Sequence, residues 1–188
     1  MRGDFLNSSS GQDVSTDGFS EVGGIKKVMT FGGDTAEGRL DSASTAFSDN
    51  DIIAYAGELD TSLPTGLHVA TKILVEKIVW MPSTATGNTM VGNISAGTAA
   101  NEAVNGAVTG QVELFGAGAT YRNANLAADL SITEVDIDFN GSTIQYAQPL
   151  IILPAATKYI YVCTTTAINH ATNFDAGKYN LAIHYTVL

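Results

Sequence analysis

Cysteine is almost absent from this chain of 188 residues, which contains Cys163 and no other. One cysteine excludes an internal disulfide and any metal site built from several thiolates. Long apolar runs are also missing, since no stretch reaches the roughly 18 apolar residues of a membrane-spanning helix. Basic residues are scarce: nine Lys and Arg oppose 19 Asp and Glu, for a net charge of −10. Such a chain repels phosphate backbones and lacks a polybasic patch, so we expect no nucleic-acid and no membrane partner.

The sequence also lacks the patterns of catalysis. His68, His170 and His184 are far apart, and none has a neighbouring histidine or cysteine with ligand spacing. Nucleophile-elbow, dinucleotide-binding and phosphate-loop motifs do not occur. We therefore expect no enzyme activity, no metal site and no cofactor. The residues from Met1 to Leu6 show no hydrophobic signal core, which predicts synthesis in a cytoplasm.

Alternation of apolar and polar residues is the main positive signal. Over the last eleven residues it is continuous, and the residues predicted to share the buried face are Tyr179, Leu181, Ile183, Tyr185 and Val187. A period of two is typical of a half-buried β-strand. Further strands are predicted at 51–59, 69–81, 89–95, 111–115, 129–139, 143–153 and 158–166. Residues 97–110 are predicted as a long loop or one or two helical turns.

The strand over residues 69–81 is apolar on both faces. Alternation places Val69, Ile73, Val75, Val79 and Met81 on one face and Leu74, Ile78 and Trp80 on the other. This predicts an inner strand that is covered on both sides for part of its length. Asn140-Gly141 predicts a tight hairpin that pairs 129–139 with 143–153, because both residues tolerate positive φ. About eight strands without a long amphipathic helix predict an all-β, antiparallel, jelly-roll-like sandwich.

The first fifty residues differ from the rest, and we predict two regions. Residues 1–50 form an extended, Gly/Ser/Asp-rich acidic arm with a short strand near 25–31, and residues 51–188 form the β-domain. Residues 1–60 hold 11 acids and 4 bases, so most of the negative charge is there. Two hypotheses stand for the arm: it contacts a partner, or it is a surface tail or packs on its own body. Its apolar anchors for a partner would be Phe5, Leu6, Ile25, Val28, Met29 and Phe31.

Three acidic residues, Glu134, Asp136 and Asp138, are predicted to share one face of a strand. Residues two apart on a strand are separated by about 6.6 Å, whereas Ca²⁺ needs its oxygen ligands at about 2.3–2.6 Å. Two neighbours could share an ion only with help from another strand or subunit. We therefore predict a solvated or subunit-interface row in preference to a calcium site.

Three segments carry a resemblance to a known family. They are the apolar strand Lys72 to Met81, the Thr/Gly/Asn-rich strand and loop from Thr89 to Asn101, and the final strand Ile183 to Leu188 after Ala176-Gly177. In this order, over roughly residues 67–188, the chain resembles the jelly-roll capsid decoration (cement) proteins of tailed bacteriophages.

The resemblance implies a non-enzymatic virion structural protein on the outer capsid surface. Its partners would be the major capsid protein, whose subunit contacts it stabilises, and further copies of itself in a homotrimer. Two alternatives remain open at this stage. One is a head or tail fibre component or adhesin that binds host glycan, and the other is a carbohydrate-active or lectin-like module of similar architecture. The buried-strand spacing of the tyrosines and Trp80 favours core packing over a sugar platform.

Overall fold

The computed structural model describes residues 24–32, 47–48, 50–64, 69–84, 91–116, 137–138, 144–165 and 178–188. Within these ranges all regular structure is β, and no helix occurs, so none of them supplies a helix able to cross a bilayer. The strands are β1 (Ile25–Gly32), β2 (Ile52–Glu58), β3 (Lys72–Thr84), β4 (Val91–Gly97), β5 (Val112–Phe115), β6 (Ile137–Asp138), β7 (Gln145–Ala147), β8 (Ile151–Pro154), β9 (Tyr159–Thr164) and β10 (Lys178–Val187). The all-β prediction is confirmed.

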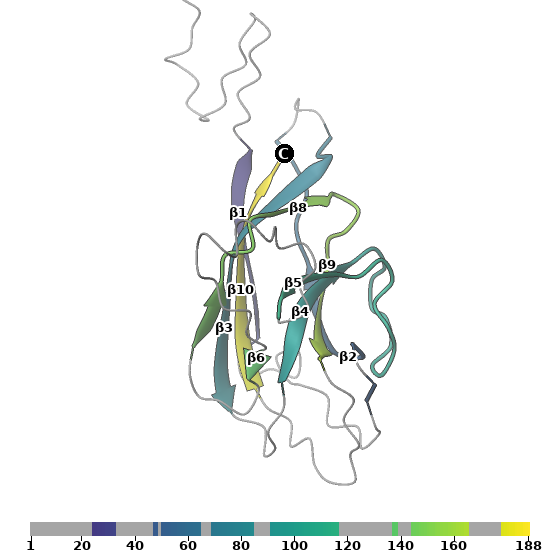
Figure 1. Ribbon diagram of the computed structural model, residues 1–188. Coiled ribbons are helices and arrows are strands. Elements are labelled where there is room, and N and C mark those ends of the chain that lie inside the picture. The colour runs from purple at the N-terminus through teal and green to yellow at the C-terminus, as the bar shows by residue number, and fades with distance from the viewer. Residues whose placement is uncertain are drawn as a thin grey trace, which may run out of the picture.

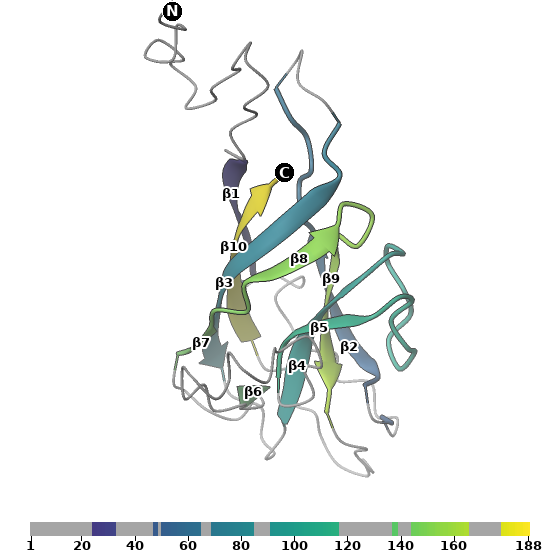
Figure 2. The same ribbon diagram turned by 45° about the horizontal axis from the view of Figure 1, so that its top comes forward.

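The strands form two antiparallel sheets (Figure 1). In the first sheet the order is β1-β10-β3, and β7 and β8 both pair with the far edge of β3. In the second sheet the order is β2-β9-β4, and β5 and β6 both pair with β4. Figure 2 shows β8 and β7 following one another along β3. Together β7 and β8 therefore act as one interrupted edge strand.

A shared apolar core lies between the two sheets, because one buried cluster takes side chains from both. The first sheet contributes Trp80 and Tyr179, whose rings stack with centroids 4.3 Å apart. The second sheet contributes Ile94 and Val162, both fully buried. Strand β10 follows its predicted alternation, since its five predicted inward residues are all buried.

Strand β3 departs from simple alternation at a β-bulge. Along β10, His184 pairs with Lys77 while the next residue, Tyr185, pairs with Val75, so Glu76 is the extra residue. A bulge puts two residues opposite one and shifts the alternation by one position. Ile78 and Trp80 consequently face the core together with Val75, and the predicted division of β3 into two faces is wrong beyond Glu76.

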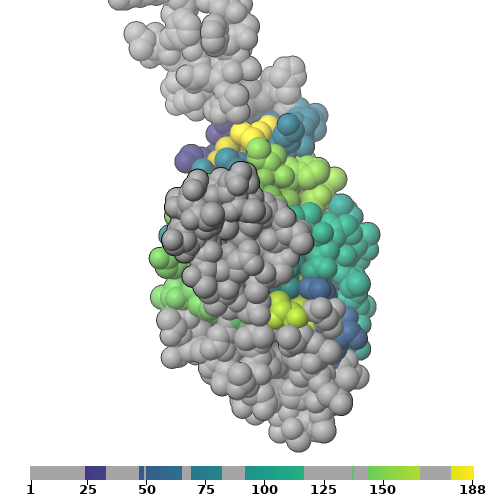
Figure 3. All heavy atoms as spheres, viewed as in Figure 1, coloured from purple at the N-terminus to yellow at the C-terminus, as the bar shows by residue number. Residues whose placement is uncertain are grey.

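The first strand belongs to the first sheet. It pairs with β10 over its whole length, from Ile25 opposite Val187 to Gly32 opposite Asn180. In the space-filling view the residues of β1 (purple) and the C-terminal residues (yellow) lie beside each other (Figure 3). Phe47 is also buried in the shared core. Residues 24–32 and Phe47, which the sequence analysis assigns to the arm, are thus packed parts of the β-body.

The pairing predicted around Asn140-Gly141 does not occur among the described residues. Ile137–Asp138 pairs with β4 in the second sheet, whereas Gln145–Ala147 pairs with β3 in the first. Strands in different sheets share no ladder, so the chain changes sheets here. The turn itself lies outside the described residues. Residues 98–110, between β4 and β5, form turns and bends without a helix.

A polar tether joins β1 to the segment that follows β2. Lys27 Nζ lies 2.7 Å from Asp60 Oδ2 and donates to the carbonyl oxygen of Ser62 at 2.7 Å. The hydroxyl of Tyr185 donates to the carbonyl oxygen of Asp60 at 3.2 Å. The hydrogen bond from Lys27, followed by those from Ser62, holds the pKa of Asp60 well below its usual range.

This tether predicts a measurable acid sensitivity. A carboxyl whose pKa is lower in the folded state stabilises the protein above its unfolded pKa of about 3.9 and loses that contribution as pH falls towards the folded value. Asp60→Asn should lower the free energy of unfolding by less than about 1 kcal/mol at pH 7, because the Asp60 carboxylate is largely exposed to solvent. Urea unfolding of both proteins between pH 7 and pH 2 checks this. The difference in unfolding free energy between the two proteins should narrow progressively as pH falls below about 4, and a difference independent of pH would contradict the assignment.

Candidate functional site

The outer face of the first sheet exposes several large apolar side chains. Those at least half exposed there are Val28, Ile144, Tyr146, Leu150 and Ile152. Four of these five lie on or beside β7 and β8, at the edge of the sheet. We call this surface, with the outward residues of β3 and β10, the open face.

The register of the strands brings these side chains together in rows. One row runs Thr186, Leu74, Ile152 across β10, β3 and β8. Another runs Ala182, Val79, Tyr146 across β10, β3 and β7. Neighbours within a row have Cβ atoms about 4.5–5.5 Å apart. We call these two rows the apolar band; they end at the exposed Ile152 and Tyr146 and are separated by Glu76 and Lys77 on β3 and His184 on β10.

The charged residues of the open face are mostly lysines. Lys26, Lys72 and Lys77 are exposed there, and Glu76 is the described acid among them. Glu76 Oε1 pairs with Lys26 Nζ at 3.4 Å, and Glu76 Oε2 accepts a hydrogen bond from the Thr186 hydroxyl at 3.2 Å. The described part of this face is therefore locally positive in a chain of net charge −10.

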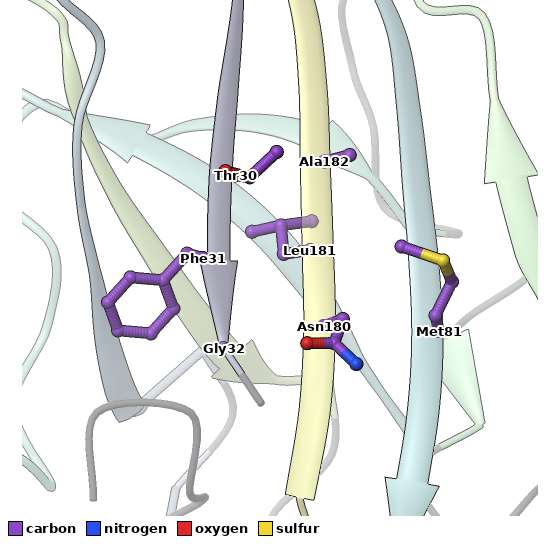
Figure 4. Close-up of a pocket in the computed structure, with 7 residues that line it drawn as sticks. All are labelled: Thr30, Phe31, Gly32, Met81, Asn180, Leu181 and Ala182. Atoms are coloured by element: carbon purple, nitrogen blue, oxygen red, sulfur yellow. The ribbon is translucent and has the colours of Figure 1, made fainter. Parts of the chain in front are cut away.

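A hollow of about 450 Å³ adjoins the apolar band, at the end of β1, β10 and β3. Figure 4 shows Asn180 of β10 beside Met81 of β3, with Thr30 of β1 further along. Gly32 forms part of the lining and has a φ of +114°. The hollow combines an amide and a hydroxyl with apolar walls, a lining that suits a protein side chain or a sugar ring.

The backbone of Leu150 adopts an unusual conformation within the open face. Its φ is +49°, in the left-handed region that costs an L-residue with a side chain roughly 1–2 kcal/mol. The side chain is nevertheless 55% exposed. Strained residues persist where the surrounding structure imposes them, and they gather at functional surfaces.

The outer face of the second sheet is closed, in contrast. Residues 98–110 fold over it, and Val108 of this loop packs in a buried cluster with Ile52, Tyr161 and Cys163. The Tyr161 hydroxyl donates to the carbonyl oxygen of Ala99. Burial raises the pKa of the Cys163 thiol to about 12, so this thiol stays protonated and unreactive at neutral pH.

A buried polar network secures the same closed face. Ser95 Oγ donates to Asn93 Oδ1 at 2.7 Å and accepts from Gln111 Nε2 at 2.9 Å. Asn93 Nδ2 donates in turn to Asn50 Oδ1 at 3.1 Å. Asn93 and Ser95 are fully buried. The network joins β4 to Gln111, which precedes β5, and to Asn50, which precedes β2, and it satisfies the buried polar side chains of Asn93 and Ser95.

The predicted contact residues in β1 lie on opposite sides of the first sheet. Val28 points outward on the open face and is 54% exposed, whereas Met29 and Phe31 pack against the shared core. Ile25 opens strand β1 and is half-buried. Phe5 and Leu6 lie outside the described residues.

The predicted acidic row is described only in part. Glu134 and Asp136 lie outside the described residues, and Asp138 is described by its backbone alone, in β6 beside Val91. Among the described residues, no three His, Cys, Asp or Glu side chains are grouped so that they could hold a metal ion. A scan against protein-family models finds no match to the chain, and a search of curated proteins finds none either.

Proposed function

We propose that this protein is a non-enzymatic virion structural protein, a decoration protein that binds the outer capsid surface and stabilises contacts between major capsid protein subunits. The observation that carries the proposal is the difference between the two sheets in the described part of the chain: residues 98–110 pack on one outer face, and the other leaves an apolar band exposed. Exposed apolar bands of this kind mark protein–protein contact surfaces. The resemblance of residues 67–188 to decoration proteins of tailed bacteriophages supplies the identity of the partner.

We also propose the jelly roll as the fold. Successive strands support it, because β1, β3, β7/β8 and β10 belong to one sheet while β2, β4, β5/β6 and β9 belong to the other. Within the sheets the strand orders are β1-β10-β3-β7/β8 and β2-β9-β4-β5/β6, where a slash joins two strands that pair with the same neighbour. These orders are the ones expected for two interleaved Greek keys. Viral capsid and lectin domains share this architecture, so the fold fits the proposal without establishing it.

The mechanism follows from multivalency and mass action. A homotrimer presents three copies of one contact at the same time, so weak individual contacts give tight attachment. A protein that binds the assembled lattice and not its separated subunits stabilises the lattice. The stabilisation is about 2.7 kcal/mol per binding site when the concentration of the free protein is 100 times Kd.

Calorimetry of empty capsid shells tests this proposal. The temperature of shell dissociation should rise with added protein and reach a plateau at a fixed copy number. An unrelated acidic protein of similar size and charge serves as the control. Saturable binding without any rise would refute stabilisation, and no binding at any concentration would refute decoration.

A second candidate function, an adhesin or fibre component that binds host glycan, is favoured by one specific observation. Tyr146 is 70% exposed, in the same row as Ala182, which lines the 450 Å³ hollow. An exposed aromatic ring can stack on a sugar, and the hollow two strands away, on β10, offers the Asn180 amide to sugar hydroxyls. The loop around Tyr121 lies outside the described residues. Glycan binding that Tyr146→Ser abolishes, with no effect on shells, would favour this candidate.

A further inference from the structure

The apolar edge formed by β7 and β8 is the part of the body that most needs a partner. Both strands pair with β3 on one side, and their exposed residues Tyr146 and Ile152 continue the apolar band of the sheet. An exposed apolar edge strand is an aggregation hazard that soluble proteins protect with charge or cover with another surface. The described edge carries no charged residue between Ile144 and Pro154.

The charges around this edge indicate what kind of surface covers it. Lys72 and Lys77 lie on β3, directly behind β8 and β7, and within the described ranges neither makes an ion pair. Lys26 adds a third positive charge beyond them, and Glu76 compensates one. A complementary surface would therefore have an apolar centre bordered by carboxylates.

We infer that the open face is the surface that contacts the capsid lattice, an inference that rests on the proposed function. Tyr146, Leu150 and Ile152 form the centre of this contact surface. Lys72 and Lys77 form its border. Its partner is a protein surface with an apolar patch and acidic side chains around it. A second copy of this chain docked by the same face would oppose lysine to lysine, which is unfavourable. Three lysines are fewer than the four to eight of a typical anionic-lipid site.

The size of the surface determines how strong one contact is. Together with Ile144, the three central residues make four side chains of at most ~250 Å² each, about 60% exposed, which give no more than roughly 600 Å². Each partner in a standard stable interface buries about 800 Å². The apolar centre of a single copy therefore makes a weak contact, and attachment depends on the lysine border and on several copies that bind at once.

Leu150 provides a variant that separates binding from folding. Leu150→Gly removes an exposed apolar side chain and also relieves the left-handed strain. The entropic cost of glycine, roughly 0.5–1 kcal/mol, offsets the relief, so stability stays almost unchanged. Val69→Ser is the matched control, because Val69 is 87% exposed but precedes β3 and lies outside the open face.

Co-sedimentation of the full-length protein with empty capsid shells tests the inference. Leu150→Gly should weaken binding at least threefold and Tyr146→Ser with Ile152→Ser at least tenfold, while Val69→Ser binds as the unaltered protein does. Lys72→Glu with Lys77→Glu should weaken binding at low salt and reduce its salt dependence. Lys158→Glu, immediately before β9 of the second sheet, is the control for charge. Emission from Trp80 during urea unfolding verifies that each variant is folded.

The outcomes separate the inference from the function on which it rests. Binding by the unaltered protein and equally by every open-face variant would overturn the inference and leave decoration intact. No binding by the unaltered protein would overturn both. Light scattering follows oligomeric state in parallel, and if the open-face variants lose self-association together with binding, the face is a contact between copies and the inference fails. Binding of the unaltered protein to anionic vesicles through Lys72 and Lys77 would overturn it as well.

Discussion

Replacing Trp80 by alanine is expected to lower the free energy of unfolding by about 3–5 kcal/mol, the largest effect of any single substitution that we predict. Trp80 is 1% exposed, and its indole ring stacks on Tyr179 between the two sheets. Alanine would leave a large cavity at the point where β3 and β10 face the second sheet. Whole-domain stabilities of 5–15 kcal/mol are usual, so a loss of this size is a large share of the total.

Urea unfolding followed by circular dichroism measures this loss, since the variant lacks the only tryptophan of the chain. Tyr146→Ala is the matched control, because it removes an aromatic ring that is 70% exposed and should cost less than about 1 kcal/mol. A loss below about 1.5 kcal/mol for Trp80→Ala would mean that the indole is not part of a close-packed core.

Gly32→Ala is expected to have the second largest effect, a loss of about 3 kcal/mol. Gly32 has a φ of +114°, and a Cβ at this position would lie 1.9 Å from the carbonyl oxygen of Tyr179. Backbone atoms of β10 cannot move aside as the end of a flexible side chain can. The substitution should therefore detach the end of β1 from β10.

Gly57→Ala isolates the steric part of that effect. Gly57 has a similar φ of +125°, but its Cβ would meet side chains alone: the flexible end of Met29 at 3.1 Å and Phe31 Cδ2 at an ordinary 4.0 Å. Gly57→Ala should therefore lower the free energy of unfolding by the conformational strain alone, about 1–2 kcal/mol. Thermal unfolding of both variants gives the comparison, and equal losses would show that the close approach of β1 to β10 at Gly32 is absent in solution.

Much of the fold could be predicted from local pattern. The alternation from Tyr179 to Val187 correctly identified both the last strand and its buried face. The same rule failed within β3, because a bulge at Glu76 leaves no trace in a pattern that is apolar on both faces. The hairpin expected at Asn140-Gly141 failed for a different reason: turn chemistry is local, but the sheet that each flanking strand joins is decided by packing.

The candidate site was harder to predict than the fold. Ile144, Tyr146 and Ile152 lie at alternate positions of the predicted strand 143–153, but alternation alone does not show whether their face is buried or exposed. Only the pairing of β7 and β8 with β3 shows that this alternation points outward. Met29 and Phe31 illustrate the reverse case, since an apolar residue in a segment rich in glycine and serine resembles an exposed anchor until its strand is paired.

Cryo-electron microscopy of empty shells incubated with the full-length protein tests the central claim most directly. The account predicts one β-body at each equivalent position outside the shell, with the β7–β8 edge and the open face against the lattice and residues 98–110 facing away. Bare shells would contradict the proposed function. A body attached through residues 98–110, with Tyr146 and Ile152 in solvent, would contradict the assignment of the open face.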